Sequence, residues 1–416
     1  MSDLILMNIP ELVTCASKGP KFGVAMKDAG IISNAYVVIK KGIIDEVGAM
    51  DDYDKHKLTD FLGEVVDCEG HAVLPGFVDA HTHFVFGGYR ADEFKMRLEG
   101  ADYMSIMAAG GGIASSVEAT RTTDEKTLYN LGVERLDGML KMGVTTVEGK
   151  SGYGLDLETE LKQLKVMKAL NEDHLVDVVA TFLGPHSVPA AYKNDADGFI
   201  EYMSTVVLPE VAQQNLAEFA DIFCEAGVFS VDQSRRYFEA ARQLGFKLKI
   251  HADEIVQLGG AELAAELKAI SADHLLAASD QGIQALADKG VVATLLPATA
   301  FSLKEAYADA RKMMRAGCAV ALASDFNPGS CPTHSIPLII ALSALQMGMT
   351  IEEIINALTI NAAAAINRAD TVGSIEVGKK ADILLLSQPS INYLPYHLGM
   401  NLIERVVKNG RFVGDY

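Results

Sequence analysis

The sequence predicts an α/β protein whose main body is a (β/α)₈ TIM-type barrel, with a small β-sandwich domain built from both chain ends. Three observations predict this fold. Eight short apolar runs recur through the middle of the chain, amphipathic helical segments lie between them, and β-branched segments gather near the two ends. Continuous apolar strands followed by amphipathic helices are typical of a parallel sheet covered by helices on its outer face. Eight such units within about 300 residues fit a closed barrel.

Residues 1–66 are expected to form the N-terminal part of the small domain, and residues 373–416 the C-terminal part. Each end is too short to bury a core alone, so we expect the two ends to pair into one sheet domain. Lys41-Gly42 and Asn409-Gly410 predict hairpin turns between neighbouring strands. The predicted strands of this domain are 35–40, 43–47, 62–68, 382–386, 403–407 and 411–413.

Residues 67–372 are expected to form the barrel. Between two of its runs, Leu157, Leu161, Leu164, Met167 and Leu170 recur at spacings of three and four, which predicts one apolar helix face. A doubly wound open sheet is the alternative, but it would need a glycine-rich phosphate turn after an early strand, and the glycine run 110–112 follows no predicted strand. The eight predicted strands are 77–83, 144–150, 177–186, 220–225, 247–251, 269–274, 291–297 and 318–325.

The composition excludes several classes of protein and of partner. With 416 residues, 49% of them apolar and 22% charged, the chain is neither disordered nor collagen-like. Its 36 basic and 55 acidic residues give a net charge of −19, which disfavours nucleic acid and anionic membranes as partners but still permits a small anionic substrate. Five widely spaced cysteines without a CxxC pair, no basic leader and no long apolar run together predict a cytoplasmic protein.

Polar side chains with metal-binding chemistry gather where the predicted barrel strands end, which is the end that carries chemistry in this fold. His81 and His83 close the first run two residues apart, so both can point to the same face. His251 ends the fifth run, His274 the sixth and Asp325 the eighth. Any one of these histidines could be a hydrogen-bonded structural residue. As a set, imidazoles with a carboxylate suit Zn²⁺ or Fe²⁺.

Four segments resemble the amidohydrolase superfamily: PGFVDAHTH on the first strand, HADE on the fifth, DH on the sixth and SDFNPG on the eighth. Within it, HFVFGGYRADEF, EGKSGYGL, TFLGPHSVP and SDFNPGS resemble the imidazolonepropionase family over nearly the whole chain. The resemblance implies a homodimer and the metal ligands His81, His83, His251 and Asp325. It also implies one divalent metal, Zn²⁺ or Fe²⁺, with Fe³⁺ and Mn²⁺ as further candidates.

A second metal is not expected. Many members of the superfamily bridge two metals with a carboxylated lysine at the end of the fourth strand, but that run ends here in Phe223-Cys224-Glu225. Lys150 ends the second strand, on the wrong side for a bridge.

The chemistry that follows is hydrolysis of a C–N bond at a trigonal carbon. Glu254 and Asp325 are expected to take and relay the proton of the attacking water, and His274 to stabilise the oxyanion. Glu254 could instead cap a helix N-terminus, where carboxylates are favoured. For this family the substrate is 4-imidazolone-5-propanoate, opened to N-formimidoyl-L-glutamate in the third step of histidine degradation.

The substrate carries a carboxylate arm, which a guanidinium group matches. Arg90 stands at the family's carboxylate-binding position, and Tyr153 and His186 at positions that contact the substrate. After the eighth strand we expect free backbone N–H groups to bind substrate oxygens, with Ser330 as a helix N-cap instead as the alternative. The residues of this segment assigned to the substrate are Asn327, Gly329 and Ser330, and His334 just beyond them is expected to give structural support.

Two other functions remain open at this point. A purine or pyrimidine deaminase of the same superfamily could use the same metal motif, although a neutral base would not need Arg90 and Tyr153. A non-catalytic scaffold that retains the fold is the other alternative, but such relatives lose metal ligands, and all four stand in this sequence.

Overall fold

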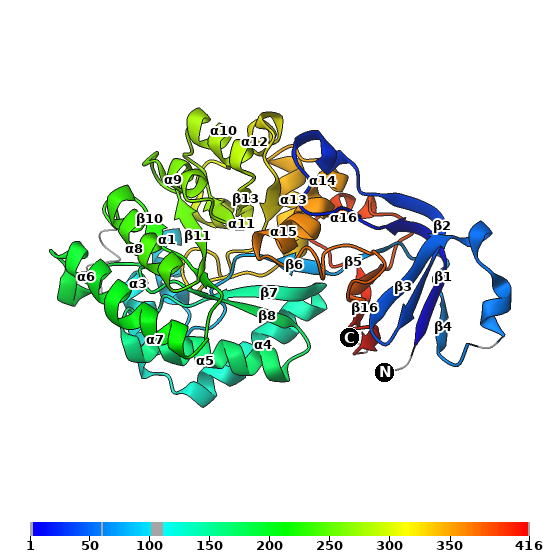
Figure 1. The fold of residues 1–416 in the computed structure, drawn as a ribbon, viewed down its shortest axis with the longest axis horizontal. Helices are drawn as coiled ribbons and strands as arrows, with labels where there is room; N and C mark the ends of the chain where they lie inside the picture. The colour runs from blue at the N-terminus through cyan, green and yellow to red at the C-terminus, as the bar shows by residue number, and fades with distance from the viewer. Residues whose placement is uncertain (1–2, 60, 101–110, 415–416) are drawn as a thin grey trace.

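The computed structural model describes residues 3–59, 61–100 and 111–414. Figure 1 shows two bodies, a barrel ringed by helices and a separate sheet beside which both chain termini lie. This architecture confirms the predicted barrel with a second sheet unit made from both ends of the chain and excludes the doubly wound alternative. Gly110 of the glycine run lies outside the described residues.

The barrel strands are all parallel and follow one another around the sheet in sequence order. All eight predicted runs contain a strand, and two short segments, β9 and β10, share the fourth position. The strands are β6 Phe77–Asp79, β7 Val144–Lys150, β8 Asp177–Phe182, β9 Phe219–Ala220, β10 Phe223–Cys224, β11 Lys247–Ala252, β12 Ser271–His274, β13 Val292–Leu295 and β14 Val320–Leu322.

The first and last barrel strands meet beyond their carboxyl ends. Thr82 and Phe326 form a parallel bridge, the N–H of Asp325 donates to the carbonyl of His81 (2.9 Å), and the N–H of His83 donates to the carbonyl of Phe326 (2.9 Å). This contact brings the predicted metal-binding motifs of the first and eighth strands side by side at one mouth of the barrel.

Helices cover the outside of the barrel, as the amphipathic segments predict. In α5 the predicted face is confirmed, because Leu161, Leu164, Met167 and Leu170 are buried and Leu157 is half-buried. Polar caps begin several helices; Asp124, for example, accepts the N–H of Thr127 at the start of α4. The helices are α1 Ala91–Leu98, α3 Ile113–Thr122, α4 Glu125–Lys141, α5 Leu157–Asp173, α6 Ala196–Tyr202, α7 Leu208–Gln213, α8 Val231–Gln243, α9 Gly260–Glu266, α10 Asp280–Lys289, α11 Pro297–Leu303, α12 Ala310–Ala316, α13 Ile336–Leu345, α14 Ile351–Leu358, α15 Ile360–Ala365 and α16 Tyr393–Tyr396.

The second sheet is mixed and combines strands from the two chain ends. Both predicted hairpins are present, and β5 joins the ends by pairing in parallel with β1 and antiparallel with β15. Leu6, Val37, Ile383 and Val407 are among the side chains buried in its core. The strands are β1 Leu4–Val13, β2 Ile31–Lys40, β3 Ile43–Ala49, β4 Glu64–Asp67, β5 Val73–Pro75, β15 Ile383–Leu386, β16 Ile403–Lys408 and β17 Arg411–Val413.

Within the described residues, no helix has the length and apolar character that crossing a membrane requires. The five cysteines are all buried and unpaired.

Candidate active site

Three histidines from distant parts of the chain converge at the carboxyl end of the barrel. His81 and His83 follow β6, and His251 lies in β11. One ring nitrogen from each falls within 4.8 Å of one from each of the others, and all three side chains are buried. This grouping follows from topology, because parallel strands bring their carboxyl ends to a common mouth.

Asp325 completes the group. Its Oδ1 lies 3.5 Å from Nε2 of both His81 and His83. Its other oxygen, Oδ2, accepts a hydrogen bond from the Thr299 hydroxyl (2.7 Å), which fixes the carboxylate plane. Burial raises the pKa of Asp325 to about 6. Sequence reasoning missed Thr299, which lies in α11 and reaches the site only through the fold.

The histidines are held in the form that binds metals. Nδ1 of His81 contacts Asp273 (2.7 Å), and Nδ1 of His251 contacts Asp221 (3.1 Å). Because a carboxylate accepts, each Nδ1 carries the proton, and each Nε2 is then the atom with a free lone pair. Within the described part of the chain, these two buried Nε2 atoms have no hydrogen-bond partner, and the same holds for Nδ1 of His83. Unpartnered basic nitrogens around a carboxylate are what a transition-metal cation would satisfy, so the residues fit the implied metal.

Burial also keeps two of these three rings neutral. It lowers the pKa of His81 well below the ordinary value, with Lys150 adding to the effect, and it lowers the pKa of His83 in the same way. His251 differs: burial alone would lower its pKa, but the charge of Asp221 and its hydrogen bond raise it.

A second group of possible metal ligands, His81 with Glu148 and Asp273, lies deeper in the barrel. The ammonium group of Lys150 lies 3.0 Å from Glu148 and 3.4 Å from Asp273, and that of Lys249 lies 3.3 Å and 3.7 Å from the same two residues. Lysine charges already neutralise these carboxylates, so the group is an ionic cluster and Lys150 is engaged within it.

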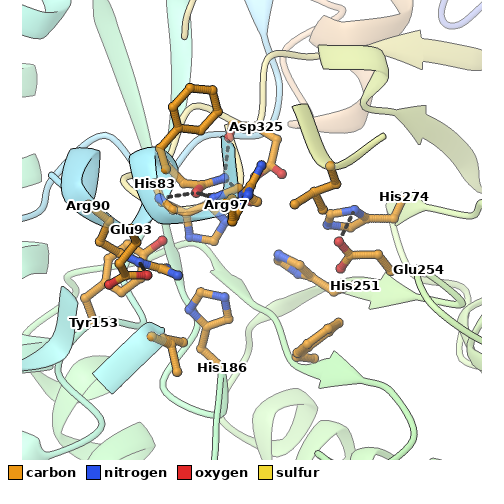
Figure 2. A pocket seen from close by; sticks show the side chains of 17 residues that line it. His83, Arg90, Glu93, Arg97, Tyr153, His186, His251, Glu254, His274 and Asp325 are labelled. Carbon is orange, nitrogen blue, oxygen red and sulfur yellow. Dashed lines mark hydrogen bonds and ion pairs between the residues drawn. The ribbon is translucent and has the colours of Figure 1, made fainter. Parts of the chain in front are cut away.

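The site opens into a cavity of about 370 Å³. Figure 2 shows His251, His274 and Glu254 on one side of it and Arg90 and Tyr153 on the other. The lining residues include His83, Arg90, Glu93, Phe94, Arg97, Ile113, Tyr153, His186, Phe223, His251, Glu254, His274, Leu303, Asp325, Asn327, Gly329 and Ser330.

Glu254 and His274 form a pair beside the histidine group. Oε1 of Glu254 lies 3.5 Å from Nδ1 of His274, whose two ring nitrogens are buried without a hydrogen-bond partner. Burial, with a contribution from Asp325, raises the pKa of Glu254 to about 8, and burial lowers the pKa of His274 well below its usual value. The alternative role of Glu254 as a helix cap is wrong, because α9 begins only at Gly260, with Gly259 at the N-cap.

Arg90 presents its guanidinium to the cavity from the start of α1 (Figure 2). Its Nε donates to Glu93 (2.8 Å), and the same Glu93 oxygen accepts the N–H of Gly112 (3.1 Å). A Cβ at Gly329 would overlap Nη1 of Arg90, so the glycine makes room for the guanidinium. Glu93 was missed from sequence, although its place three residues after Arg90 at the start of a helix is a signal for such a contact.

Tyr153 and His186 form the wall between Arg90 and the histidine group. The rings of His83 and His186 stack at 4.9 Å, and Tyr153 lies 5.4 Å from His186. Burial lowers the pKa of His186 to about 3 and raises that of Tyr153. The loop that carries Tyr153 is fixed by buried Glu160, which accepts the N–H groups of Gly152, Gly154 and Leu155; sequence reasoning missed this role.

The segment after β14 corrects one expectation. The N–H groups of Gly329 and Ser330 are not free, because both donate to Oδ1 of Asn327 (2.9 and 2.8 Å). The local asparagine side chain therefore occupies the donors expected to bind substrate oxygens. The alternative for Ser330 is also wrong, since the next helix, α13, is capped by Ser335. The three residues still line the cavity.

His334 is not among the residues lining the cavity. It packs edge-on against Phe326 at 5.1 Å, and its Nε2 lies close to Gly138, where a Cβ would come within 2.8 Å. Its structural role remains a prediction.

Comparison with known proteins adds the family. The amidohydrolase family model matches residues 72–413. The imidazolonepropionases of Clostridium tetani and Parabacteroides distasonis are each 56% identical to this chain, over 99% and 98% of it respectively and over 98% of each relative. A zinc-bound adenosine deaminase from Xanthomonas campestris superposes with a TM-score of 0.72 at 18% identity, covering 99% of this chain and 92% of that one, which supports the fold alone.

Proposed function

Because the chain belongs to the amidohydrolase family and, within it, to the imidazolonepropionases, we propose that it opens the ring of 4-imidazolone-5-propanoate with water to give N-formimidoyl-L-glutamate. This is the third step of histidine degradation to glutamate. The single observation that carries the proposal is that one cavity has a guanidinium on one side and a buried histidine and carboxylate group on the other.

His81, His83, His251 and Asp325 would hold one metal ion, divalent Zn²⁺ or Fe²⁺, with Fe³⁺ and Mn²⁺ as further candidates. The unpartnered nitrogens and the convergence of the donors support this assignment. A cation held there would supply Lewis acidity, lowering the pKa of water so that it attacks near neutral pH.

Glu254 and Asp325 would act on protons. The pKa of Glu254, raised to about 8, suits a group that takes a proton from the attacking water and returns it to the departing ring nitrogen. Asp325, beside two histidines, would orient the water. His274, with two unpartnered ring nitrogens, would donate to the carbonyl oxygen as it gains charge.

Arg90 would bind the propionate arm through its terminal nitrogens, since its Nε is already directed to Glu93. Tyr153 and His186 would contact the ring and arm, and Asn327, Gly329 and Ser330 would shape the wall behind the guanidinium, with Glu254 also touching the ring. A neutral nucleobase would offer no carboxylate to the terminal nitrogens of this half-buried guanidinium, so the deaminase alternative has no support from the cavity.

Three further assignments belong to this proposal. The second sheet unit takes in residues 1–66 and 373–416 and the barrel unit residues 67–372, except that the short strand β5, Val73–Pro75, pairs within the second sheet. The active form is a homodimer, the commonest symmetric assembly. The compartment is the cytoplasm, which the five unpaired cysteines favour.

The test is to follow the ultraviolet absorbance of 4-imidazolone-5-propanoate with purified protein, with and without a chelator, and to measure bound metal. We expect rapid loss of absorbance, formation of N-formimidoyl-L-glutamate and inhibition by the chelator. Ammonia release from guanine or cytosine without loss of imidazolone propionate would refute the proposed substrate. Less than about a tenth of an equivalent of transition metal would refute the metal centre and revive the non-catalytic alternative.

A further inference from the structure

Beneath the candidate metal site, the barrel interior holds an ionic cluster of three carboxylates and two lysines, all with fully buried side chains. Strands β7 and β11 supply the lysines, and the carboxylates come from three different strands or strand ends. The cluster consists of Glu148, Lys150, Asp221, Lys249 and Asp273. Burying so many charges is costly, and a barrel core is ordinarily filled by apolar side chains, so the cluster calls for a role.

Lys150 is the member that joins the two carboxylates holding the histidines. Its Nζ lies 2.8 Å from Oδ2 of Asp221 and 3.4 Å from Oδ2 of Asp273. Asp221 in turn accepts Nδ1–H of His251, and Asp273 accepts Nδ1–H of His81. One ammonium group is therefore linked, through two carboxylates, to two imidazoles whose Nε2 atoms face the site.

Lys249 provides an internal contrast. It is equally buried, but its closer partners are Glu148 (3.3 Å) and the carbonyls of Ala80 (3.1 Å) and Ala365 (3.2 Å). Its distance to Asp273 is 3.7 Å, outside hydrogen-bonding range, and no contact with Asp221 is found in the described part of the chain. Lys249 therefore shares the charge of Asp273 but not that of Asp221, so of the two lysines Lys150 is the one that contacts both orienting carboxylates.

We propose that Lys150 is a positioning residue whose ammonium group holds Asp221 and Asp273 so that Nε2 of His251 and His81 point to a common cation. The inference rests on the proposed metal centre. Without Lys150, the two neighbouring carboxylates lose the ammonium group that lies between them, so they repel each other and move apart. This movement displaces the acceptors that fix the orientation of the two imidazole rings, and metal affinity falls.

The experiment compares Lys150→Met with Lys249→Met in the full-length protein. The dissociation constant for Zn²⁺ is measured by competition with a chromophoric chelator, and the visible absorption of bound Co²⁺ reports the geometry of its ligands. Lys150→Met should weaken Zn²⁺ binding about 10- to 100-fold, the usual loss for an outer partner of a metal ligand, and alter the Co²⁺ spectrum. Lys249→Met should remain within about threefold of wild type on the same scale.

Two results would overturn the inference. One is a Lys150→Met protein whose Zn²⁺ affinity and Co²⁺ spectrum equal those of wild type. The other is a Lys249→Met protein that loses as much Zn²⁺ affinity as Lys150→Met does. If Lys150→Met alone does not fold by circular dichroism, both lysine changes are made in Asp221→Asn, where one buried negative charge is gone. There the Asp273–His81 arm remains, with Lys150 at 3.4 Å from Asp273 and Lys249 at 3.7 Å, so Lys150→Met should weaken Zn²⁺ binding further and by more than Lys249→Met does. No added loss would overturn the inference.

Failure of the inference can be told apart from failure of the proposed function. Wild-type protein that binds one equivalent of Zn²⁺, with Lys150→Met indistinguishable from it, removes only the role of Lys150. Wild-type protein that binds no Zn²⁺ or Co²⁺ removes the metal centre and the inference together.

Discussion

The two ends of the barrel satisfy their buried polar atoms differently. At the carboxyl end, His81, His83, His251 and His274 each carry at least one buried ring nitrogen that has no hydrogen-bond partner among the described residues. At the amino end, where the barrel meets the second sheet, buried charges are matched in pairs. The difference separates a site whose buried ring nitrogens can take a ligand from one whose charged groups are paired within the folded chain.

The amino-end group links Asp177, the first residue of β8, to the C-terminal segment. Its Oδ2 contacts the ammonium groups of Lys380 (2.8 Å) and Lys408 (2.9 Å). Lys408, which is fully buried, also contacts Asp382 at 2.7 Å. Each charge has an opposite partner at hydrogen-bonding distance, so the group can stabilise the junction without any bound ligand.

The comparison teaches where to look for function. A buried polar atom without a partner costs roughly 1–3 kcal/mol, so several in one place persist only where something else offsets the cost. Paired charges need no such explanation. We therefore expect substitutions at the carboxyl end to change activity, together with metal content where a proposed ligand is removed, and substitutions at the amino end to change stability alone.

The largest effect is expected for His251→Ala, which removes one of the unpartnered nitrogens. Metal and activity should be lost together, by more than the roughly 10- to 100-fold that loss of an outer partner costs. Metal content by elemental analysis and the ring-opening rate measure the two. Asp177→Asn serves as the control at the other end of the barrel and should retain both. An active His251→Ala protein with a full complement of metal would contradict the assigned ligand set.

Next in size is Glu254→Gln, which keeps the shape of the side chain but removes its ability to accept a proton. We expect kcat to fall about 10²- to 10⁴-fold, the range for loss of a general acid–base group, with metal content unchanged. Steady-state kinetics and elemental analysis on the same preparation test this. A kcat near wild type would leave Asp325 as the proton acceptor.

A smaller loss is expected for Arg90→Ala, which acts on the substrate arm. Truncating one partner of a buried charge pair costs about 2–5 kcal/mol, which corresponds to roughly 30- to 5,000-fold in kcat/KM. Metal content should not change. Gly329→Ala, whose Cβ would displace the guanidinium, should lower kcat/KM in the same direction by a smaller factor. Equal loss of metal in Arg90→Ala would contradict its role as a substrate-binding residue.

The sequence was sufficient for the parts of this picture that depend on repetition and topology. Eight apolar runs predicted the strands, and because parallel strands share one carboxyl end, residues that finish those runs were expected to meet. His81, His83, His251 and Asp325 do converge. The hairpin turns at both chain ends were predictable from short dipeptides, because local backbone chemistry determines a tight turn.

The partners of the site residues were not predictable in this way. Thr299 and Asp221 reach their partners through tertiary contacts that no local pattern encodes, whereas Glu93 was overlooked although it pairs locally with Arg90, three residues earlier. Asp273 was easier to find from the sequence, because it directly precedes the predicted site residue His274 in the same strand, β12. The expectation of free N–H groups at Gly329 and Ser330 failed because helix onset was placed too early, and the Asn327 side chain competes for those donors.

The smallest effect is expected for Asp177→Asn at the amino end of the barrel. This substitution should change the free energy of unfolding and leave activity unchanged, in contrast to the substitutions at the carboxyl end. Burial alone would raise the pKa of Asp177, but Lys408 and Lys380 outweigh it and the pKa is lowered. A carboxyl group with a depressed folded pKa stabilises the protein above its unfolded pKa of about 3.9, and this contribution is lost as pH falls through the folded value. The free energy of unfolding of wild type should therefore exceed that of Asp177→Asn by about 1–3 kcal/mol near neutral pH.

The difference should shrink as pH falls below about 4, because wild-type Asp177 then takes up a proton and its charge is lost as well. Urea denaturation of both proteins at a series of pH values measures it, and the ring-opening rate at neutral pH should agree within about twofold, since the rate reports the other end of the barrel. A stability difference independent of pH would show that packing, and not charge pairing, joins the two units. A large loss of activity in the folded Asp177→Asn protein would show that the two ends of the barrel are coupled.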